Sequence, residues 1–124
     1  MLRPAPLKFN DQAVIISPSG KIDECLVHDT AAILENWGLK TEFGRFALGE
    51  TGRFSGSVYE RLFDLQSAFD NPLVKLIFCS RGGYGVIHLL DKLDFSSIRK
   101  HPKWVIGYSD ITALHAALQK NGIA

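Results

Sequence analysis

A serine stands at a turn where a nucleophile would be exposed. The motif Gly107-Tyr-Ser-Asp110 joins the predicted strand Trp104–Gly107 to a helical pattern that opens at Ile111. A serine at such a turn holds its hydroxyl above the sheet, beside the free amides of the helix start, as in the nucleophile elbow of acyl-transfer enzymes. The amide of Asp110 would then donate to a developing oxyanion. The usual elbow has glycine where this chain has Ile111, and a simple helix N-cap at Ser109 or Asp110 fits the same pattern.

A second turn, Ser80-Arg-Gly-Gly-Tyr-Gly85, is rich in glycine and follows the predicted strand Val74–Cys79. Adjacent glycines let a backbone approach a ligand closely, which phosphate-binding loops and oxyanion holes both require. The third glycine of a dinucleotide fingerprint is missing after Gly83-Tyr-Gly85, and Ser19-Gly-Lys21 matches only the end of a P-loop. A small anion- or nucleotide-binding module therefore remains an alternative to catalysis.

Catalysis by a serine also requires a base, and the histidines do not supply a convincing one. His28 falls within a predicted helix and His101 in a loop, while His115 lies in the serine's own helix and is expected to point away from the turn. His88 is placed to approach the crevice, but no acid is visibly placed to orient it. The chain therefore offers a nucleophile without its base.

Cys79 is an alternative nucleophile, because it ends a strand beside glycine amides that would stabilise a thiolate. We favour a buried, inert thiol, since free cysteines behave as small apolar side chains in protein cores. The other cysteine is Cys25, and two cysteines alone form neither a disulfide framework nor a zinc site. We expect both thiols to be free, as in a reducing cytoplasm, and no metal to be bound.

Hydrophobic patterning predicts strands that alternate with helices. The predicted strands are 13–17, 39–43, 74–79 and 104–107. Helices are predicted between Asp23 and Gly38, between Ser57 and Asn71, near 86–90 and from Ile111 to about Gly122, with a turn or short helix at 93–98. This order indicates an α/β fold with a mostly parallel open sheet and helices on both faces, a three-layer arrangement that is Rossmann-like or class I amidotransferase-like.

The active crevice of such a sheet lies beyond the carboxyl ends of its strands. The polar or glycine-rich turns 17–20, 79–85 and 107–110 all follow strands, so we expect them to meet at this edge. The helices that flank the sheet should bury one stripe each. In the first helix that stripe is Leu26, Ile33 and Trp37, and in the second it is Val58, Leu62, Leu65 and Phe69.

Composition excludes several classes of protein. The 124 residues carry 14 basic and 13 acidic side chains, a net charge of +1, so there is no basic footprint for nucleic acid. No apolar run approaches the ~20 residues that span a bilayer, and Pro4 and Pro6 interrupt the start where a signal peptide needs an apolar helix. We expect a single domain over 1–124 that binds neither membrane nor nucleic acid.

The motifs Ser80-Arg-Gly-Gly-Tyr-Gly85 and Ile106-Gly-Tyr-Ser-Asp-Ile-Thr-Ala-Leu114 resemble those of the serine LD-carboxypeptidases, a family that includes murein tetrapeptide carboxypeptidases and microcin C immunity peptidases. Supporting matches are Val14-Ile-Ile-Ser-Pro-Ser-Gly20, the loop Gly52-Arg-Phe-Ser-Gly56 and Leu93-Asp-Phe continuing to Ile98. The resemblance runs from about Ala13 to Leu118. It therefore covers nearly the whole chain.

The resemblance implies that Ser109 is the nucleophile, and that the oxyanion hole uses the amide of Asp110 with that of Gly82 or Gly83. The family cuts an amide between an L-centre and a terminal D-residue, typically releasing D-alanine from the murein tetrapeptide in cytoplasmic cell-wall recycling. It needs no metal or cofactor, and its members are often homodimers. The expected substrate contacts are Arg81, Tyr84 and Ser19, with a structural pairing to a nearby aspartate as the alternative role for Arg81.

Full members of the family are much longer, and the glutamate and histidine of their triad lie in a C-terminal domain. We therefore interpret 1–124 as the N-terminal, nucleophile-bearing domain, and expect the isolated chain to fold but to be nearly inactive. A lost domain would leave apolar surface exposed. Within the family, an antibiotic of the acyl-adenylate type, as for the microcin C immunity peptidases, is the alternative to the muropeptide substrate.

Overall fold

The structure is a computed structural model that describes residues 3–16, 24–45, 58–79, 87–107 and 111–123. Strands and helices alternate along the chain in the predicted way. They are β1 (Gln12–Ile16), α1 (Glu24–Asn36), β2 (Lys40–Phe43), α2 (Val58–Asp70), β3 (Val74–Cys79), α3 (Ile87–Leu90), α4 (Ser96–Lys100), β4 (Trp104–Ile106) and α5 (Ile111–Lys120). None of the helices in these ranges is long and apolar enough to cross a membrane.

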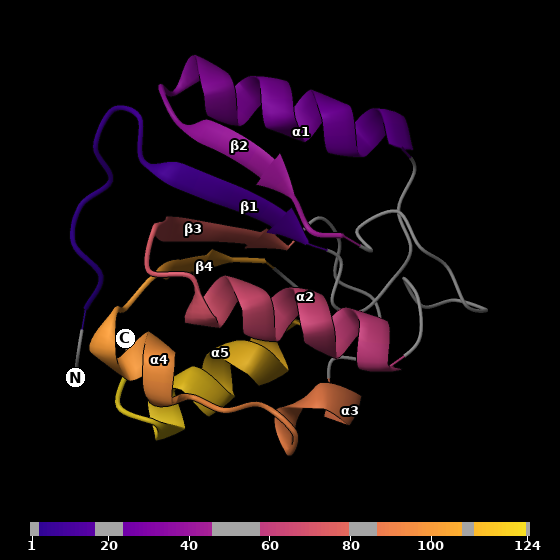
Figure 1. Cartoon of the computed structure of the whole chain (residues 1–124), viewed down its shortest axis with the longest axis vertical. Helices are drawn as coiled ribbons and strands as arrows, with labels where there is room; N and C mark the ends of the chain where they lie inside the picture. Colours follow the sequence, from indigo (N-terminus) through magenta and orange to yellow (C-terminus); the bar gives the residue numbers. More distant parts are fainter. Residues whose placement is uncertain (1–2, 17–23, 46–57, 80–86, 108–110, 124) are drawn as a thin grey trace.

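The four strands form one parallel sheet in the order β2-β1-β3-β4 (Figure 1). In its register Ile16 pairs with Cys79, and Phe78 pairs with Ile106. The carboxyl ends of β1, β3 and β4 are therefore nearly level at one edge of the sheet. This confirms the predicted α/β fold with a parallel sheet, and it places the last residues of these strands at one edge of the sheet.

Each face of the sheet has its own apolar cluster, because successive side chains of a strand point to opposite faces. On one face Ala13, Ile15 and Leu76 pack with Ala31 and Leu34 of α1. The other face carries a larger cluster under α2, α3, α4 and α5. Its buried members are Ile16, Leu65, Ala68, Phe69, Val74, Ile77, Cys79, Leu89, Ile98, Ile111, Leu114, Leu118 and Ile123.

The predicted stripe of α2 is confirmed, and that of α1 is wrong. Leu65 and Phe69 are fully buried, with Val58 and Leu62 packed against the same cluster. In α1 the predicted stripe contains Ile33 and Trp37, which are 52% and 62% exposed, while Ala31 and Leu34 are buried instead. The side chain of Leu26 lies outside the described residues. The reason is the turn of about 100° per residue, which carries Ile33 away from the face that Leu34 buries.

Segment 93–98, predicted as a turn or short helix, leads into the helix α4. The Asp94 carboxylate accepts hydrogen bonds from the backbone amide and the hydroxyl of Ser96, and these bonds lower the pKa of Asp94. Gln66 of α2 binds both backbone polar atoms of Asp94, at 2.8 and 3.0 Å. Arg99 then donates to Asn121 beyond α5 at 2.9 Å. These bonds tie α2, α4 and α5 into one layer.

Candidate active site at the carboxyl edge of the sheet

The carboxyl edge of the sheet is formed by the last residues of three adjacent strands. Ile16 of β1 and Cys79 of β3 are paired in register, and Ile106 of β4 pairs with the residue before Cys79. Figure 1 shows the strand arrows running toward the same side of the molecule. The structure therefore brings together the three places where the predicted turns 17–20, 79–85 and 107–110 begin.

The seven predicted site residues themselves lie outside the described residues. They are Ser19 in segment 17–23, Arg81, Gly82, Gly83 and Tyr84 in segment 80–86, and Ser109 and Asp110 in segment 108–110. Their roles stay predictions. The described residues define the positions from which these segments leave the sheet and re-enter the helices.

Gly107, which follows β4, packs tightly against the first residue of α5. A Cβ atom at this position would lie 2.6 Å from Cγ2 of Ile111 and 2.9 Å from its Cβ, closer than carbon atoms normally approach. Ile111 is itself fully buried. The chain thus turns from strand to helix with no room for a side chain at Gly107. A glycine at this position is consistent with a nucleophile elbow, whose pattern begins with glycine.

The same contact accounts for the departure from the usual elbow sequence. The elbow pattern has a glycine at the position of Ile111, but here that side chain fills the space over Gly107 and joins the apolar cluster beneath α5. The isoleucine therefore stabilises the start of α5.

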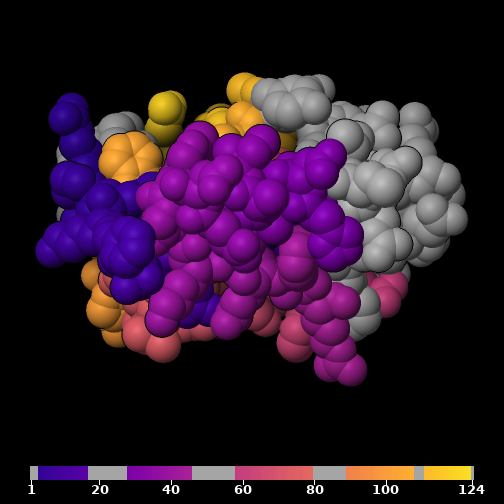
Figure 2. Space-filling model, turned by 90° about the horizontal axis from the view of Figure 1, so that it is seen from above, coloured from indigo at the N-terminus to yellow at the C-terminus, as the bar shows by residue number. Residues whose placement is uncertain are grey.

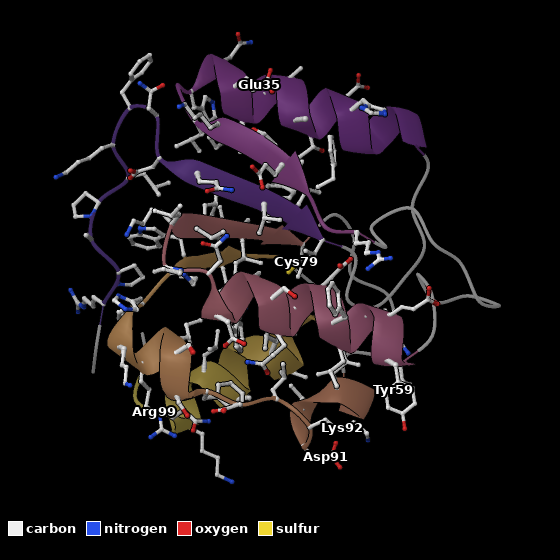
Figure 3. The ribbon with its side chains drawn as sticks, viewed as in Figure 1. Glu35, Tyr59, Cys79, Asp91, Lys92 and Arg99 are labelled. Carbon is white, nitrogen blue, oxygen red and sulfur yellow. The ribbon has the colours of Figure 1, made fainter. Side chains whose placement is uncertain are left out.

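Cys79 is buried at the end of β3, between the sheet and α2 (Figure 3). Burial raises the pKa of its thiol to about 12. At neutral pH the thiol is therefore protonated, and a protonated thiol is a poor nucleophile. The structure supports the interpretation of Cys79 as an inert core residue, while the side chain of Cys25 lies outside the described residues.

Three histidines have described side chains. The Nε2 atom of His115 lies 3.1 Å from the carbonyl oxygen of Val105. Because a carbonyl oxygen can only accept a hydrogen bond, Nε2 carries the proton. The ring of His28 meets Phe43 edge to face, with centroids 5.4 Å apart. His101 is exposed after α4, ahead of β4. None of these contacts orients a catalytic base, and the side chain of His88 lies outside the described residues.

Two buried charged residues of α2 were missed by the sequence analysis, which used only the apolar stripe of this helix. Arg61 is 2% exposed and Asp64 is 6% exposed. A Cβ atom at Gly44, just after β2, would lie 2.6 Å from Oδ2 of Asp64 and 2.9 Å from Ile16. The Asp64 carboxylate therefore lies against the carboxyl edge of the sheet. An arginine and an aspartate three residues apart on one helix face were the signal available in the sequence.

Comparison with known proteins agrees with this arrangement. Residues 14–124 match the family model of the LD-carboxypeptidase N-terminal domain. The chain is 37% identical over 119 residues to a probable murein peptide carboxypeptidase of Bacillus subtilis, covering 96% of the chain and 37% of that protein. It is 34% identical over 116 residues to the murein tetrapeptide carboxypeptidase of Pseudomonas aeruginosa, covering 93% and 38%.

Solved structures give the same result. The microcin C7 self-immunity protein MccF, in complex with aspartyl sulfamoyl adenosine, superposes with a TM-score of 0.90 at 30% identity. The match covers 98% of this chain and 38% of that protein. The chain thus spans about two fifths of the length of these relatives. It belongs to the LD-carboxypeptidase family and corresponds to the N-terminal domain of that family.

Proposed function

We propose that this chain is the nucleophile-bearing domain of a serine LD-carboxypeptidase that releases D-alanine from the murein tetrapeptide. The observation that carries the proposal is the close packing of Gly107, at the carboxyl edge of the parallel sheet, on Ile111 at the start of α5. Ser109 lies between these two residues in the sequence. Family membership supports the reaction class, since two of the relatives that match over nearly the whole chain are a probable murein peptide carboxypeptidase and a murein tetrapeptide carboxypeptidase.

In the proposed reaction the Ser109 hydroxyl gives its proton to the base and its oxygen attacks the carbonyl carbon of the terminal L–D amide. The backbone amide of Asp110 and that of Gly82 or Gly83 donate hydrogen bonds to the oxyanion. These bonds stabilise the negative charge that develops on this oxygen in the transition state. The C–N bond then breaks, D-alanine leaves with a proton from the base, and an acyl-enzyme remains on Ser109. Water hydrolyses that ester and restores the serine.

Substrate binding in this proposal uses side chains of the same segments. Arg81 holds the terminal carboxylate through paired N–H donors, a geometry that suits guanidinium. Tyr84 and Ser19 contact the peptide from the glycine-rich turn and from the segment after β1. The base, and most of the pocket that selects the substrate, belong to a C-terminal part of a longer enzyme, which we expect to act as a cytoplasmic homodimer.

An antibiotic of the aminoacyl-adenylate type is the second candidate substrate. The observation that favours it is the TM-score of 0.90 to MccF bound to aspartyl sulfamoyl adenosine. A related structure of that protein is an active-site mutant in which a serine, an asparagine and a lysine are replaced by alanine. Both candidates use the same nucleophile, so they differ in the group bound and not in the chemistry.

The test is D-alanine release from the murein tetrapeptide, followed by mass spectrometry. The assay compares the chain alone, a fusion of the chain to the C-terminal part of the Bacillus subtilis relative, and the Ser109→Ala fusion. We expect release by the fusion only, with a loss of at least about 1,000-fold on substitution of the serine. The control is Ser67→Ala, an exposed serine of α2, which should leave the rate unchanged.

Two outcomes would contradict the proposal. Release that survives Ser109→Ala would exclude this serine as the nucleophile. No release of D-alanine, together with cleavage of an aspartyl sulfamoyl adenosine substrate by the same fusion, would replace the muropeptide with the second candidate substrate.

A further inference from the structure

Asp64 and Arg61 of α2 are charged side chains in the interior of the molecule. They stand three residues apart, a spacing that puts side chains on one face of a helix, and both are buried. Their neighbours on this face, Leu65, Ala68 and Phe69, belong to the large apolar cluster. Neither charged residue is free of interactions. Apolar side chains of similar volume typically stabilise a core as well as a buried pair of charges does, so stability alone does not account for these two residues.

The two charged residues lie in the part of α2 that is nearest to the carboxyl edge of the sheet. The helix begins at Val58, on the side toward which the strand arrows point, and Arg61 and Asp64 fall in its first two turns (Figure 1). Figure 2 shows the opposite face of the sheet, where α1 and β2, in purple and magenta, form most of the surface. The sheet therefore separates the two charged residues from that surface.

The carboxylate of Asp64 lies against the ends of two strands. A Cβ atom at Gly44, directly after β2, would lie 2.6 Å from Oδ2 and 2.8 Å from Cγ of Asp64, and 2.9 Å from Cγ2 of Ile16. The backbone amide of Gly44 donates to the carbonyl of Ile15 at 2.7 Å, so the ladder between β2 and β1 extends to this residue. Asp64 is thus packed on the place where the ends of β1 and β2 meet.

Ile16 connects this contact to the rest of the carboxyl edge. It is fully buried, it ends β1, and it pairs in register with Cys79 at the end of β3. In the sequence, the segment that carries Ser19 begins directly after Ile16, and the segment that carries Arg81 begins directly after Cys79. A shift of Ile16 therefore moves the starting points of segments that hold predicted substrate contacts.

We propose that Asp64 is a positioning residue for substrate binding: its buried carboxylate, held against Gly44 and Ile16, fixes the ends of β2 and β1 from which two segments of the site begin. Arg61 supplies the opposite charge on the same helix face, which lowers the cost of burying the carboxylate. The proposal rests on the proposed function for the nature of the substrate. Ser109 follows β4, which lies two strands away from β1, so we expect Asp64 to affect binding more than the chemical step.

The first experiment measures hydrogen exchange of the Gly44 amide in the chain by NMR. Asp64→Asn keeps the size of the side chain and removes its charge, which leaves the charge of Arg61 buried with less compensation. We expect the Gly44 amide to exchange at least about tenfold faster, because the ends of β1 and β2 open locally. The matched control is Ile98→Val, a buried residue of α4 at the opposite edge of the sheet, which should leave this rate unchanged.

The second experiment measures the kinetics of D-alanine release by the fusion to the C-terminal part of the Bacillus subtilis relative. Asp64→Asn should raise KM at least about tenfold and change kcat less than about threefold, since displaced binding segments weaken substrate binding. Ile98→Val should change neither constant. Gly44→Ala keeps the charge but places a Cβ atom where the carboxylate lies, so it should raise KM as well. The double variant Gly44→Ala, Asp64→Asn should raise KM by less than the product of the two single effects.

Unchanged exchange of the Gly44 amide in Asp64→Asn would overturn the proposal. A loss of stability with KM unchanged would also overturn it, because Asp64 would then be a structural residue only, and so would a fall in kcat without a rise in KM. If Asp64→Asn does not fold, Gly44→Ala decides both measurements, with exchange read at the amide of position 44. Faster exchange in Asp64→Asn, together with a parent fusion that releases no D-alanine, would leave the positioning of the strand ends standing and contradict the proposed function instead.

Discussion

The two faces of the sheet differ in how far their buried apolar clusters extend across the strands. On the face of α2, α3, α4 and α5, helices cover strands from β1 to β4, and Ile16, Ile77 and Ile111 are fully buried in one cluster. On the face of α1, the buried cluster stops before β4, where Trp104 and Ile106 are exposed. The difference teaches that both faces hold the fold over β1 and β3, but that only one of them has a complete apolar cover over β4.

The largest predicted effect compares matched isoleucines on the two faces. Ile77→Ala should lower the free energy of unfolding by about 2–5 kcal/mol, because it opens a cavity in the complete cluster. Ile106→Ala should cost only about 1 kcal/mol in the chain alone, since this side chain is 41% exposed. Urea denaturation monitored by circular dichroism measures both. Similar costs would mean that the two faces contribute equally.

The next effect concerns the contact between Gly107, after β4, and Ile111 at the start of α5. Gly107→Ala places a Cβ atom 2.6 Å from Cγ2 of Ile111, so α5 must shift or the turn must open. Overpacking of this kind typically costs about 1–3 kcal/mol. The double variant Gly107→Ala, Ile111→Ala removes Cγ1 and Cγ2 of the clashing side chain, so its loss should be smaller than the sum of the two single losses. A variant as stable as the parent chain would contradict the tight turn.

A smaller effect is expected at Lys103, which is buried directly before β4. Its Nζ donates to the carbonyls of Asn71 and Val74 at 2.6 and 2.7 Å. Burial, and then the charge of Lys75, lower the pKa of Lys103 to about 8 from 10.5. Between these values the unfolded chain binds more protons than the folded chain, so stability should rise with pH from 8 to 10.5.

The expected gain is about 2 kcal/mol, from the size of the shift. Urea denaturation at pH 7.5 and pH 10 measures it, with Lys103→Met as the control that should lose this dependence. The same slope in both proteins would mean that other groups cause the pH dependence.

Much of the fold could be predicted from the sequence, because the relevant signals are local. The apolar run Val74–Cys79 is a strand with the predicted bounds, and the stripe that ends at Phe69 is buried as predicted. The stripe that contains Ile33 and Trp37 was wrong because apolar spacing does not state which side of a helix meets the sheet.

The site was predictable in its place but not in its details. Strand order brings the carboxyl ends of β1, β3 and β4 to one edge, as the alternation of elements indicated. The close packing of Gly107 on Ile111 depends on tertiary structure, and so does the burial of Arg61 and Asp64. From the sequence alone a charged residue is expected to be exposed, because the side chains that could pair with it in the core are not known.

The most direct test of the central claim is capture of the acyl-enzyme. The fusion described above is mixed with the murein tetrapeptide, quenched in acid within milliseconds, digested and analysed by mass spectrometry. We predict an acyl group on the peptide that contains Ser109, with the mass of the substrate less D-alanine, and none in the Ser109→Ala fusion. Turnover without any adduct on this peptide, or an adduct on Cys79, would contradict the claim that this chain carries the nucleophile at Ser109.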